Sequence, residues 1–332
     1  MLDKKLSNPT SLTALGWQSC FQEQFELALK KWDSCTPARV VEHYKTEITV
    51  STASENFNIN LLSSMPELVV GDWLLLNNNQ QFLQLLDRKT CFSRKAPGKK
   101  PKKQLIASNI DIAFIVSSMN DDFNLNRIER FLALVHASGA EPVIILSKKD
   151  KTQTPEEFVA AVQALDSNLT VKAINCLEMK SRDTLSPWLK SSVTIAMLGS
   201  SGVGKSTLIN TILGENRQAT GEIRAQDKKG RHTTTKRSLI QLNTGGLILD
   251  TPGIREVQLI DCKAGIASTF SDVLHYASQC RFNNCAHQAE PHCAVQQAIQ
   301  SGDLNARRLA SYFKLIQEEA LHSTVRNQRT KK

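Results

Sequence analysis

Hydrophobic and polar residues follow two different rhythms along this chain of 332 residues. Over residues 38–93, segments such as ARVVEHYKTEITVSTAS and FNINLL alternate apolar and polar positions, as strands with one buried face do. LVVGDWLLLN and QQFLQLLDRKTCFSRK follow, with turn residues between them. Several short strands at regular spacing predict a small β-barrel.

From residue 106 to about residue 259 the rhythm changes to longer apolar runs separated by helical segments. The expected strands are IDIAFIVSS, PVIILS, LTVKAIN, SVTIAMLG, SLIQLN and GGLILD, and the expected helices include 126–137 and 155–165. Apolar strands that alternate with helices predict a mainly parallel sheet covered on both faces. The remainder is expected to be helical, interrupted by a cysteine cluster.

These patterns predict a multidomain α/β chain in four parts. They are an N-terminal extension at 1–35, a β-barrel with a basic linker at 36–103, an α/β domain at 104–260 and a helical domain at 261–332. A weak helical pattern over 18–31 ends at Thr36-Pro37. The linker at 94–103 carries six basic residues and two prolines. It is expected to be mobile, either as a solvated connection or as an arm that contacts phosphates.

The formal net charge of +9 and the pI near 9.1 favour a polyanionic partner, either nucleic acid or an anionic surface. A basic protein without such a partner is the alternative. No apolar run reaches the roughly 18 residues of a membrane span, and no signal peptide is evident. We therefore expect a cytoplasmic protein without a membrane partner. A monomer is also expected.

A glycine-rich segment, GSSGVGKS at 199–206, matches the phosphate-loop pattern G-x-x-x-x-G-K-[ST]. An expected strand precedes it and an expected helix follows, so a chance turn is the weaker interpretation. Its backbone N–H groups and the helix N-terminus suit a phosphate chain. Lys205 is expected to reach the β- and γ-phosphates. The candidate phosphate-binding residues are Gly199, Ser200, Ser201, Gly202, Val203, Gly204, Lys205, Ser206 and Thr207.

Magnesium ligands are expected around this loop. The Ser206 hydroxyl is one candidate, and Asp250 at the end of an apolar strand is another. Gly253 in the following DTPG segment would let its N–H approach the γ-phosphate. A threonine of the segment GRHTTTK at 230–236 can complete the shell. Thr234 is slightly favoured among the three, and a β-branched strand start is the alternative.

A base-recognition segment, SKKD at 147–150, lies upstream of the phosphate loop at the end of a strand. The Asp150 carboxylate can accept two hydrogen bonds from guanine, which adenine does not offer. Lys148 would cover one face of the base, and Lys149 completes the segment. Ser147 stands where Asn or Thr is usual, and a basic strand-to-helix loop is the alternative. Asn175-Cys176 is a candidate second base loop that departs from the usual Ser-Ala pair.

The order SKKD, GSSGVGKS, GRHTTT and DTPGI resembles the RsgA (YjeQ) family of ribosome-associated GTPases. The segments FIVSSMNDDFNLNRIERFLAL and CRFNNCAHQAEPHCAV extend the resemblance over nearly the whole chain. It implies an OB-fold barrel, a circularly permuted GTPase domain and a zinc-bearing helical domain. It also implies late assembly of the small ribosomal subunit, with contacts to 16S rRNA and subunit-stimulated GTP hydrolysis. The departures at Ser147 and Asn175-Cys176 suggest a divergent member or a paralogue.

Two further candidates concern catalysis and metal binding. Ile254, after Gly253, cannot orient a water, so His232 is the nearest polar candidate, and the resemblance points to the same position. A surface histidine or an RNA contact is the alternative for His232. The cysteine cluster offers three thiolates and one imidazole, which suit a closed, structural Zn²⁺ site. Its candidate ligands are Cys280, Cys285, His287 and Cys293, with His292 as a competitor that the resemblance disfavours.

These motifs raise three candidate functions. The first is a GTPase that serves ribosome assembly. The second is a ribosome-associated RNA-binding module in which guanine nucleotide is mainly a structural ligand. The third, an ATP-using enzyme, conflicts with the expected role of Asp150.

Overall fold

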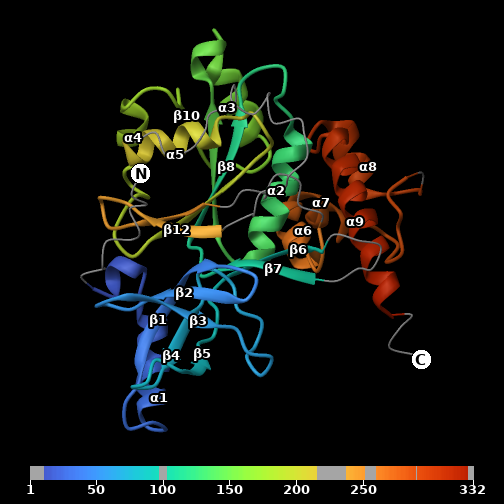
Figure 1. Ribbon diagram of the computed structural model, residues 1–332. Helices are drawn as coiled ribbons and strands as arrows, with labels where there is room; N and C mark the ends of the chain where they lie inside the picture. Colours follow the sequence, from blue (N-terminus) through green and yellow to red (C-terminus); the bar gives the residue numbers. More distant parts are fainter. Residues whose placement is uncertain (1–10, 97–102, 215–236, 251–258, 289, 328–332) are drawn as a thin grey trace, which may run out of the picture. The chain divides into compact units, whose positions relative to one another are not determined.

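The computed structural model describes residues 11–96, 103–214, 237–250, 259–288 and 290–327 (Figure 1). The chain forms two compact units. The first unit consists of Met1–Phe92, Leu105–Phe123 and Gly139–Glu256, and the second of Ser93–Gln104, Asn124–Ser138 and Val257–Lys332. Among the helices of the described ranges, none is long and apolar enough to cross a membrane.

The N-terminal segment packs on the barrel. It contains a short 3-10 helix, η1 (Thr13–Leu15), and α1 (Ser19–Leu29). Leu15 and Phe21 are buried with Trp73 of the barrel, and the Trp17 and Trp73 rings lie 4.7 Å apart. These apolar contacts show why a weak helical pattern forms a stable helix here, since most helical stability in proteins comes from packing.

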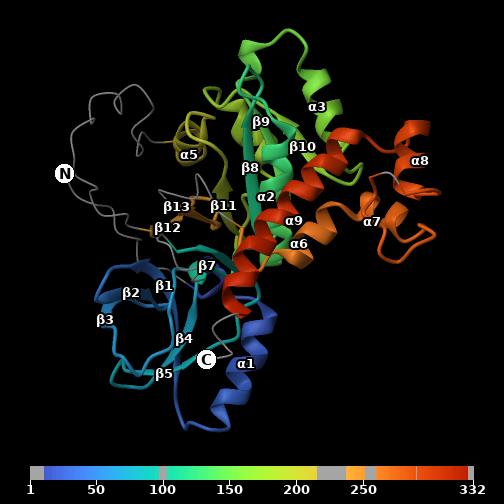
Figure 2. The same ribbon diagram turned by 90° about the vertical axis from the view of Figure 1, so that its right-hand side faces the viewer.

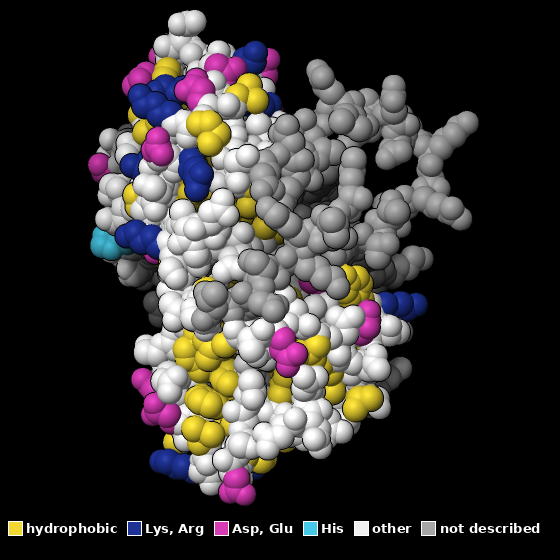
Figure 3. Space-filling model, turned by 60° about the vertical axis from the view of Figure 1, so that its left-hand side comes forward, with side chains coloured by type: hydrophobic (Ala, Val, Ile, Leu, Met, Phe, Trp, Pro, Cys, Tyr) yellow, Lys and Arg dark blue, Asp and Glu magenta, His cyan; other side chains and the backbone are white. Residues whose placement is uncertain are grey.

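The barrel strands follow the predicted alternation only in part, because β1 is buried at five consecutive positions and β4 throughout, whereas β2 and β3 come closer to alternation. They are β1 (Thr36–His43), β2 (Glu47–Ser51), β3 (Asn56–Asn60), β4 (Trp73–Leu76) and β5 (Phe82–Leu85). β1 pairs with β2 and β4, β2 with β3, and β4 with β5, all antiparallel. A separate two-stranded sheet joins β6 (Cys91–Lys95) to β7 (Lys103–Ser108). In Figure 3 hydrophobic side chains gather at the bottom of the view, where the barrel and α1 lie.

The apolar runs of residues 112–250 form the rest of the first unit's large sheet, in the order β10-β9-β8-β11-β13-β12. Neighbours pair in parallel except β12, which is antiparallel to β13. The strands are β8 (Ile112–Ser118), β9 (Glu141–Ser147), β10 (Thr170–Ala173), β11 (Thr194–Leu198), β12 (Arg237–Gln241) and β13 (Leu247–Asp250). The prediction of a mainly parallel sheet is confirmed. Figure 2 shows β11, β13 and β12 together, beside α5.

Helices connect these strands and supply one apolar layer over them. They are η2 (Lys149–Lys151), α3 (Pro155–Gln163), α4 (Lys180–Leu185) and α5 (Lys205–Leu213). Leu208 and Ile212 of α5 and Leu185 of α4 are buried in one cluster with strand residues such as Phe114 and Ile195. This cluster fixes α5, and therefore the loop before it, against the sheet.

The second unit is helical. It contains α2 (Leu125–Ser138), α6 (Lys263–Thr269), α7 (Ser271–Ala277), α8 (Ala294–Ser301) and α9 (Ala306–Asn327). α2 packs against α6, where a Cβ on Gly265 would lie 2.1 Å from the Ala133 carbonyl oxygen. Only glycine allows the two helices to approach this closely. α2, which follows β8 in sequence, thus packs with helices that lie more than a hundred residues further along the chain.

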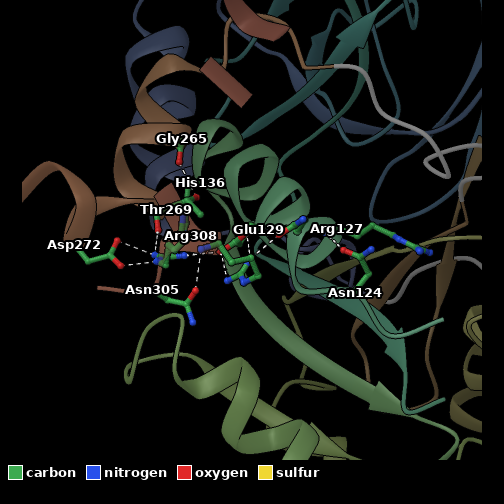
Figure 4. Close-up of polar contacts among 11 residues, drawn as sticks. Asn124, Arg127, Glu129, His136, Gly265, Thr269, Asp272, Asn305 and Arg308 are labelled. Carbon is green, nitrogen blue, oxygen red and sulfur yellow. Dashed lines mark hydrogen bonds and ion pairs between the residues drawn. The ribbon is translucent and has the colours of Figure 1, made fainter. Parts of the chain in front are cut away.

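Buried charges tie α2 to the C-terminal helices (Figure 4). Arg308 donates to Asp272 and Glu129 and to the Thr269 carbonyl, and Arg307 forms two further hydrogen bonds with Glu129. Burial alone would lower the pKa of Arg308, but the hydrogen bond and charge of Asp272 and the charge of Glu129 raise it. Because a buried arginine left without its carboxylates is costly, this network specifies which helices meet.

Candidate functional site

The glycine-rich loop lies between β11 and α5, as predicted. Gly199 has φ +141°, and a Cβ there would lie 2.3 Å from the Val116 carbonyl oxygen. Gly204 has φ +101°, and α5 begins at the next residue. These conformations need glycine, and they leave the first N–H groups of α5 without helical partners. Such a helix start is suited to bind an anion.

Lys205 lies folded over this loop. Its Nζ donates to the Gly199 carbonyl at 2.7 Å and also to the Ser200 carbonyl. Ser206 and Thr207 follow in the first turn of α5, and both are half-buried. The loop thus gathers an ammonium group, two hydroxyls and the backbone of a helix start, which are the groups that a phosphate chain needs.

Ser147 connects the base segment to the phosphate loop. It is buried at the end of β9, and its Oγ donates to the Val203 carbonyl at 2.5 Å, with the Ser117 carbonyl at 3.2 Å. The residue that departs from the usual Asn or Thr therefore bridges the two segments with its hydroxyl. The structure brings together two predicted segments that lie 56 residues apart.

The rest of the base segment leaves the sheet in a tight turn. Lys148 has φ +60° and is half-buried, and Asp150 in η2 is exposed, with an Oδ2 3.7 Å from Lys151 Nζ. Lys149 N–H donates to the Ile174 carbonyl at 3.1 Å, so the turn is attached to the residue that directly follows β10. The Asp150 carboxylate is therefore held by its backbone near the phosphate loop and is open to a ligand.

The candidate second base loop lies beside these two segments. Cys176 is buried, with its Sγ 3.6 Å from where a Cβ on Gly204 would be, and its carbonyl accepts a hydrogen bond from Thr211 Oγ1 at 2.6 Å. Burial and then the charge of Asp150 raise the pKa of the Cys176 thiol to about 12. The thiol stays neutral and packs against the phosphate loop. Thr211 and Ser117 had no sequence signal, because both act through bonds that involve backbone carbonyls.

The remaining predicted residues are only partly described. Asp250 is the last residue of β13, which runs parallel to β11, so its backbone lies at the sheet edge where the phosphate loop begins. His232, Thr234 and Gly253 lie outside the described residues.

The four residues of the predicted cysteine cluster lie close together in the second unit. Atoms of Cys280, Cys285, His287 and Cys293 lie within 4.8 Å of one another. Cys280 Sγ and Cys293 Sγ are 3.9 Å apart, and each lies 3.5 Å from His287 Nδ1. Tetrahedral zinc with ordinary bond lengths requires about 3.8 Å between sulfurs and about 3.6 Å from sulfur to nitrogen. The donor set therefore fits one zinc ion.

Neighbouring backbone and side-chain groups contact the cluster. Burial opposes ionisation of Cys280, but the N–H groups of Val295 and Ala294 at the start of α8 hold its pKa below the ordinary value. The His287 carbonyl accepts a hydrogen bond from Gln296 Nε2 at 2.6 Å, which fixes the loop. His292, the predicted competitor, is not in the group. All eight cysteines are free thiols, so no disulfide competes for them.

Sequence comparisons find close relatives. The family model described as RsgA GTPase matches residues 85–260. The chain is 48% identical over 328 residues to "Small ribosomal subunit biogenesis GTPase RsgA 2" of Vibrio parahaemolyticus, which covers 98% of this chain and 91% of the relative. It is 42% identical over 294 residues to "Small ribosomal subunit biogenesis GTPase RsgA" of Xanthomonas axonopodis pv. citri. That match covers 86% of this chain and 81% of the relative.

Two solved structures share the fold. YjeQ from Thermotoga maritima has a TM-score of 0.63 at 22% identity and covers 86% of this chain and 98% of its own. YloQ, described as a circularly permuted GTPase, has a TM-score of 0.60 at 20% identity and covers 89% of this chain and 96% of its own. Together with the cysteine cluster, these matches confirm the predicted multidomain α/β fold with its permuted central domain.

Proposed function

This chain belongs to the RsgA GTPase family and is a GTPase, and on that premise we propose that it hydrolyses GTP during late maturation of the small ribosomal subunit. The relatives are named for biogenesis of that subunit. The two Vibrio relatives, both named RsgA 2, are each 48% identical to this chain, whereas the Xanthomonas RsgA is 42% identical to it. This difference supports the view that the chain is a second family member.

The bond from Ser147 to Val203 is the observation that supports this function most directly. It joins a carboxylate-bearing turn to a phosphate loop in an order that only a permuted domain has. In this proposal Asp150 accepts hydrogen bonds from guanine N1–H and the exocyclic amine, and Lys148 covers the base. The phosphate chain lies along the loop from Gly199 to Thr207, with Lys205 on the β- and γ-phosphates.

Magnesium would accompany the nucleotide. Hydroxyl and carboxylate oxygens are the ligands that it prefers, and the first turn of α5 and the end of β13 offer both at one sheet edge. Ser206, Thr234 and Asp250 would hold the ion, which neutralises charge on the phosphates. Gly253 would direct its N–H at the γ-phosphate, and His232 would orient the attacking water.

The rRNA contacts are proposed for the barrel and the zinc-bearing part of the second unit. Zinc held by Cys280, Cys285, His287 and Cys293 would be structural, because four protein ligands leave no open position. In the same loop Phe282 is 42% exposed, with the Arg281 guanidinium 5.6 Å from its ring. An exposed aromatic beside a cation offers a base a surface on which to stack. We further propose that the protein acts as a monomer in the cytoplasm.

Release of inorganic phosphate from Mg-GTP, with and without purified small ribosomal subunits, tests this function. We expect the subunits to raise kcat at least about tenfold, since completing a GTPase site in trans has effects of this size or larger. GTP that binds without turnover in either condition would favour the RNA-binding module with a structural nucleotide. Competition by ATP equal to that by GTP would contradict guanine recognition.

A further inference from the structure

One barrel strand pairs directly with the central sheet. β1 is antiparallel to β12, with Glu42 opposite Ser238 and His43 opposite Arg237. Ser238 is also opposite Asp250 on its other side. Glu42, Ser238 and Asp250 therefore lie in one row across three neighbouring strands of the first unit. Because paired strands are about 4.8 Å apart, the barrel backbone is about 10 Å from that of Asp250.

This row lies at the functional end of the sheet. β12 is antiparallel to β13, so the beginning of β12 lies beside the end of β13. The barrel thus contacts β12 at the edge where the phosphate loop and Asp250 are, and among the described residues the pairing joins Glu42 and His43 to Ser238 and Arg237. A ladder at this place is suited to transmit a small displacement of β1 to β12 and its neighbour β13.

Arg237 stabilises this junction with its side chain. It is the first residue of β12 and half-buried, and its Nη1 lies 3.1 Å from the Ile106 carbonyl oxygen and 3.5 Å from that of Leu105, both in β7. Its charge also reaches the barrel. The pKa of His43 lies below its ordinary value. Burial lowers it most and the charge of Arg237 lowers it next, whereas the nearby Asp72 and Glu67 act in the opposite direction. One guanidinium therefore links β12 to β7 and lies against β1.

A second contact holds the barrel at the opposite end of the sheet. The Arg39 guanidinium is fully buried and donates to Thr194 Oγ1 and the Asn109 carbonyl, both at 2.9 Å, and to the Leu15 carbonyl. Thr194 begins β11, whereas the phosphate loop follows the end of β11. With the barrel anchored at this end, the β1–β12 ladder is where a change in the barrel reaches the phosphate edge.

We propose that Arg237 is a positioning residue for GTP hydrolysis, which holds β12 to the barrel so that RNA bound by the barrel sets the place of Asp250. The inference rests on the proposed function in one respect, that the ligand of the barrel is ribosomal RNA. Coupling between two sites is reciprocal, so the nucleotide bound at the site then shifts the conformation of β1 with the same coupling free energy.

Hydrolysis by the full-length protein with saturating small ribosomal subunits is the first test. Arg237→Ala is expected to lower the stimulated kcat about tenfold, the upper range for a coupling residue, and Arg237→Lys to restore part of it. The KM for GTP, subunit affinity and the basal rate are expected to stay within about twofold, because the hydrogen bonds described for Arg237 are to the Leu105 and Ile106 carbonyls of β7. Arg182→Ala, a half-buried arginine on α4, is the matched control and should leave all four quantities unchanged.

An unchanged stimulated kcat in Arg237→Ala would overturn the proposal. So would a loss of subunit affinity with kcat intact at saturation, since Arg237 would then be an RNA contact. If the wild-type protein shows no stimulation by subunits, the proposed function fails. The coupling between the barrel and the nucleotide site is then decided by a second test that uses no ribosome.

Hydrogen exchange of the protein alone provides that second test. Exchange of amides 40–43 in β1 is compared between GDP and a non-hydrolysable GTP analogue. We expect a difference of about threefold or more in the wild type, no difference in β5, and loss of the difference in Arg237→Ala. Equal exchange of β1 in both nucleotide states would show that the barrel does not sense the site, whatever its ligand.

Discussion

The nucleotide site and the cysteine cluster differ in how far apart along the chain their residues lie. The cluster draws its four ligands from fourteen consecutive residues, 280–293, in the second unit. The nucleotide site, in the first unit, gathers the segments 147–150, 174–176 and 199–207 on three strand ends. A metal ion can hold together a loop that has little core of its own. A site built from strand ends depends on every strand pairing between them.

The two sites should therefore fail differently. Loss of one ligand from the cluster removes the bonds that fix its loop. Loss of one contact in the nucleotide site leaves the sheet in place and changes only affinity or specificity.

Removal of zinc should give the largest effect. Structural zinc contributes on the order of 10 kcal/mol in small zinc domains. We expect His287→Ala to lose bound zinc and to abolish protection of amides 278–295 from hydrogen exchange, with basal GTP hydrolysis within about twofold of wild type. Zinc content by elemental analysis and local exchange measure this. His292→Ala is the matched control, and loss of zinc in that variant would mean that the ligand has been assigned to the wrong histidine.

Replacement of Asp150 should give the next largest effect, on specificity alone. The side-chain amide of an Asn at this position can pair with xanthine. Its NH₂ group cannot pair with the exocyclic amine of guanine, because both groups are donors. We expect Asp150→Asn to change the ratio of kcat/KM for GTP over xanthosine triphosphate by about 10⁴, as for other sites that leave a polar group unpaired. Asp166→Asn, the same substitution in the turn after α3, should leave the ratio unchanged. A ratio that Asp150→Asn does not move would remove Asp150 from base recognition.

Local patterns in the sequence predicted much of both sites. The segments expected as strands contain β8, β10, β11 and β13 and miss only the first residue of β9 and of β12, and the helix expected at 126–137 lies within α2. The phosphate loop and the cysteine cluster are contiguous motifs whose chemistry follows from residue types and spacing. The two metal ligand candidates Ser206 and Asp250 also lie on the elements expected for them.

Contacts between distant segments could not be predicted in this way. Glu129 and Arg308 have exposed fractions of only 0% and 4%, although charged helical residues are mostly exposed. Their burial depends on a partner 179 positions away. The pairing of Glu42 with Ser238 has no sequence signature either, because a period of two shows which face is buried and not which strand is the neighbour.

Ser147 offers the smallest and sharpest comparison, since one hydroxyl joins the base turn to the phosphate loop. Ser147→Ala leaves the buried Val203 carbonyl without this donor, at a cost of about 1 kcal/mol, or about fivefold in affinity. We expect the Kd for GTP and GDP to rise together by that factor, with kcat unchanged, because the bond is equally present in both states. Ser147→Thr keeps the hydroxyl and should retain affinity. If Ser147→Ala instead unfolds the loop, as His287→Ala is expected to do in the cluster, then the two sites would not differ in the way their assembly implies.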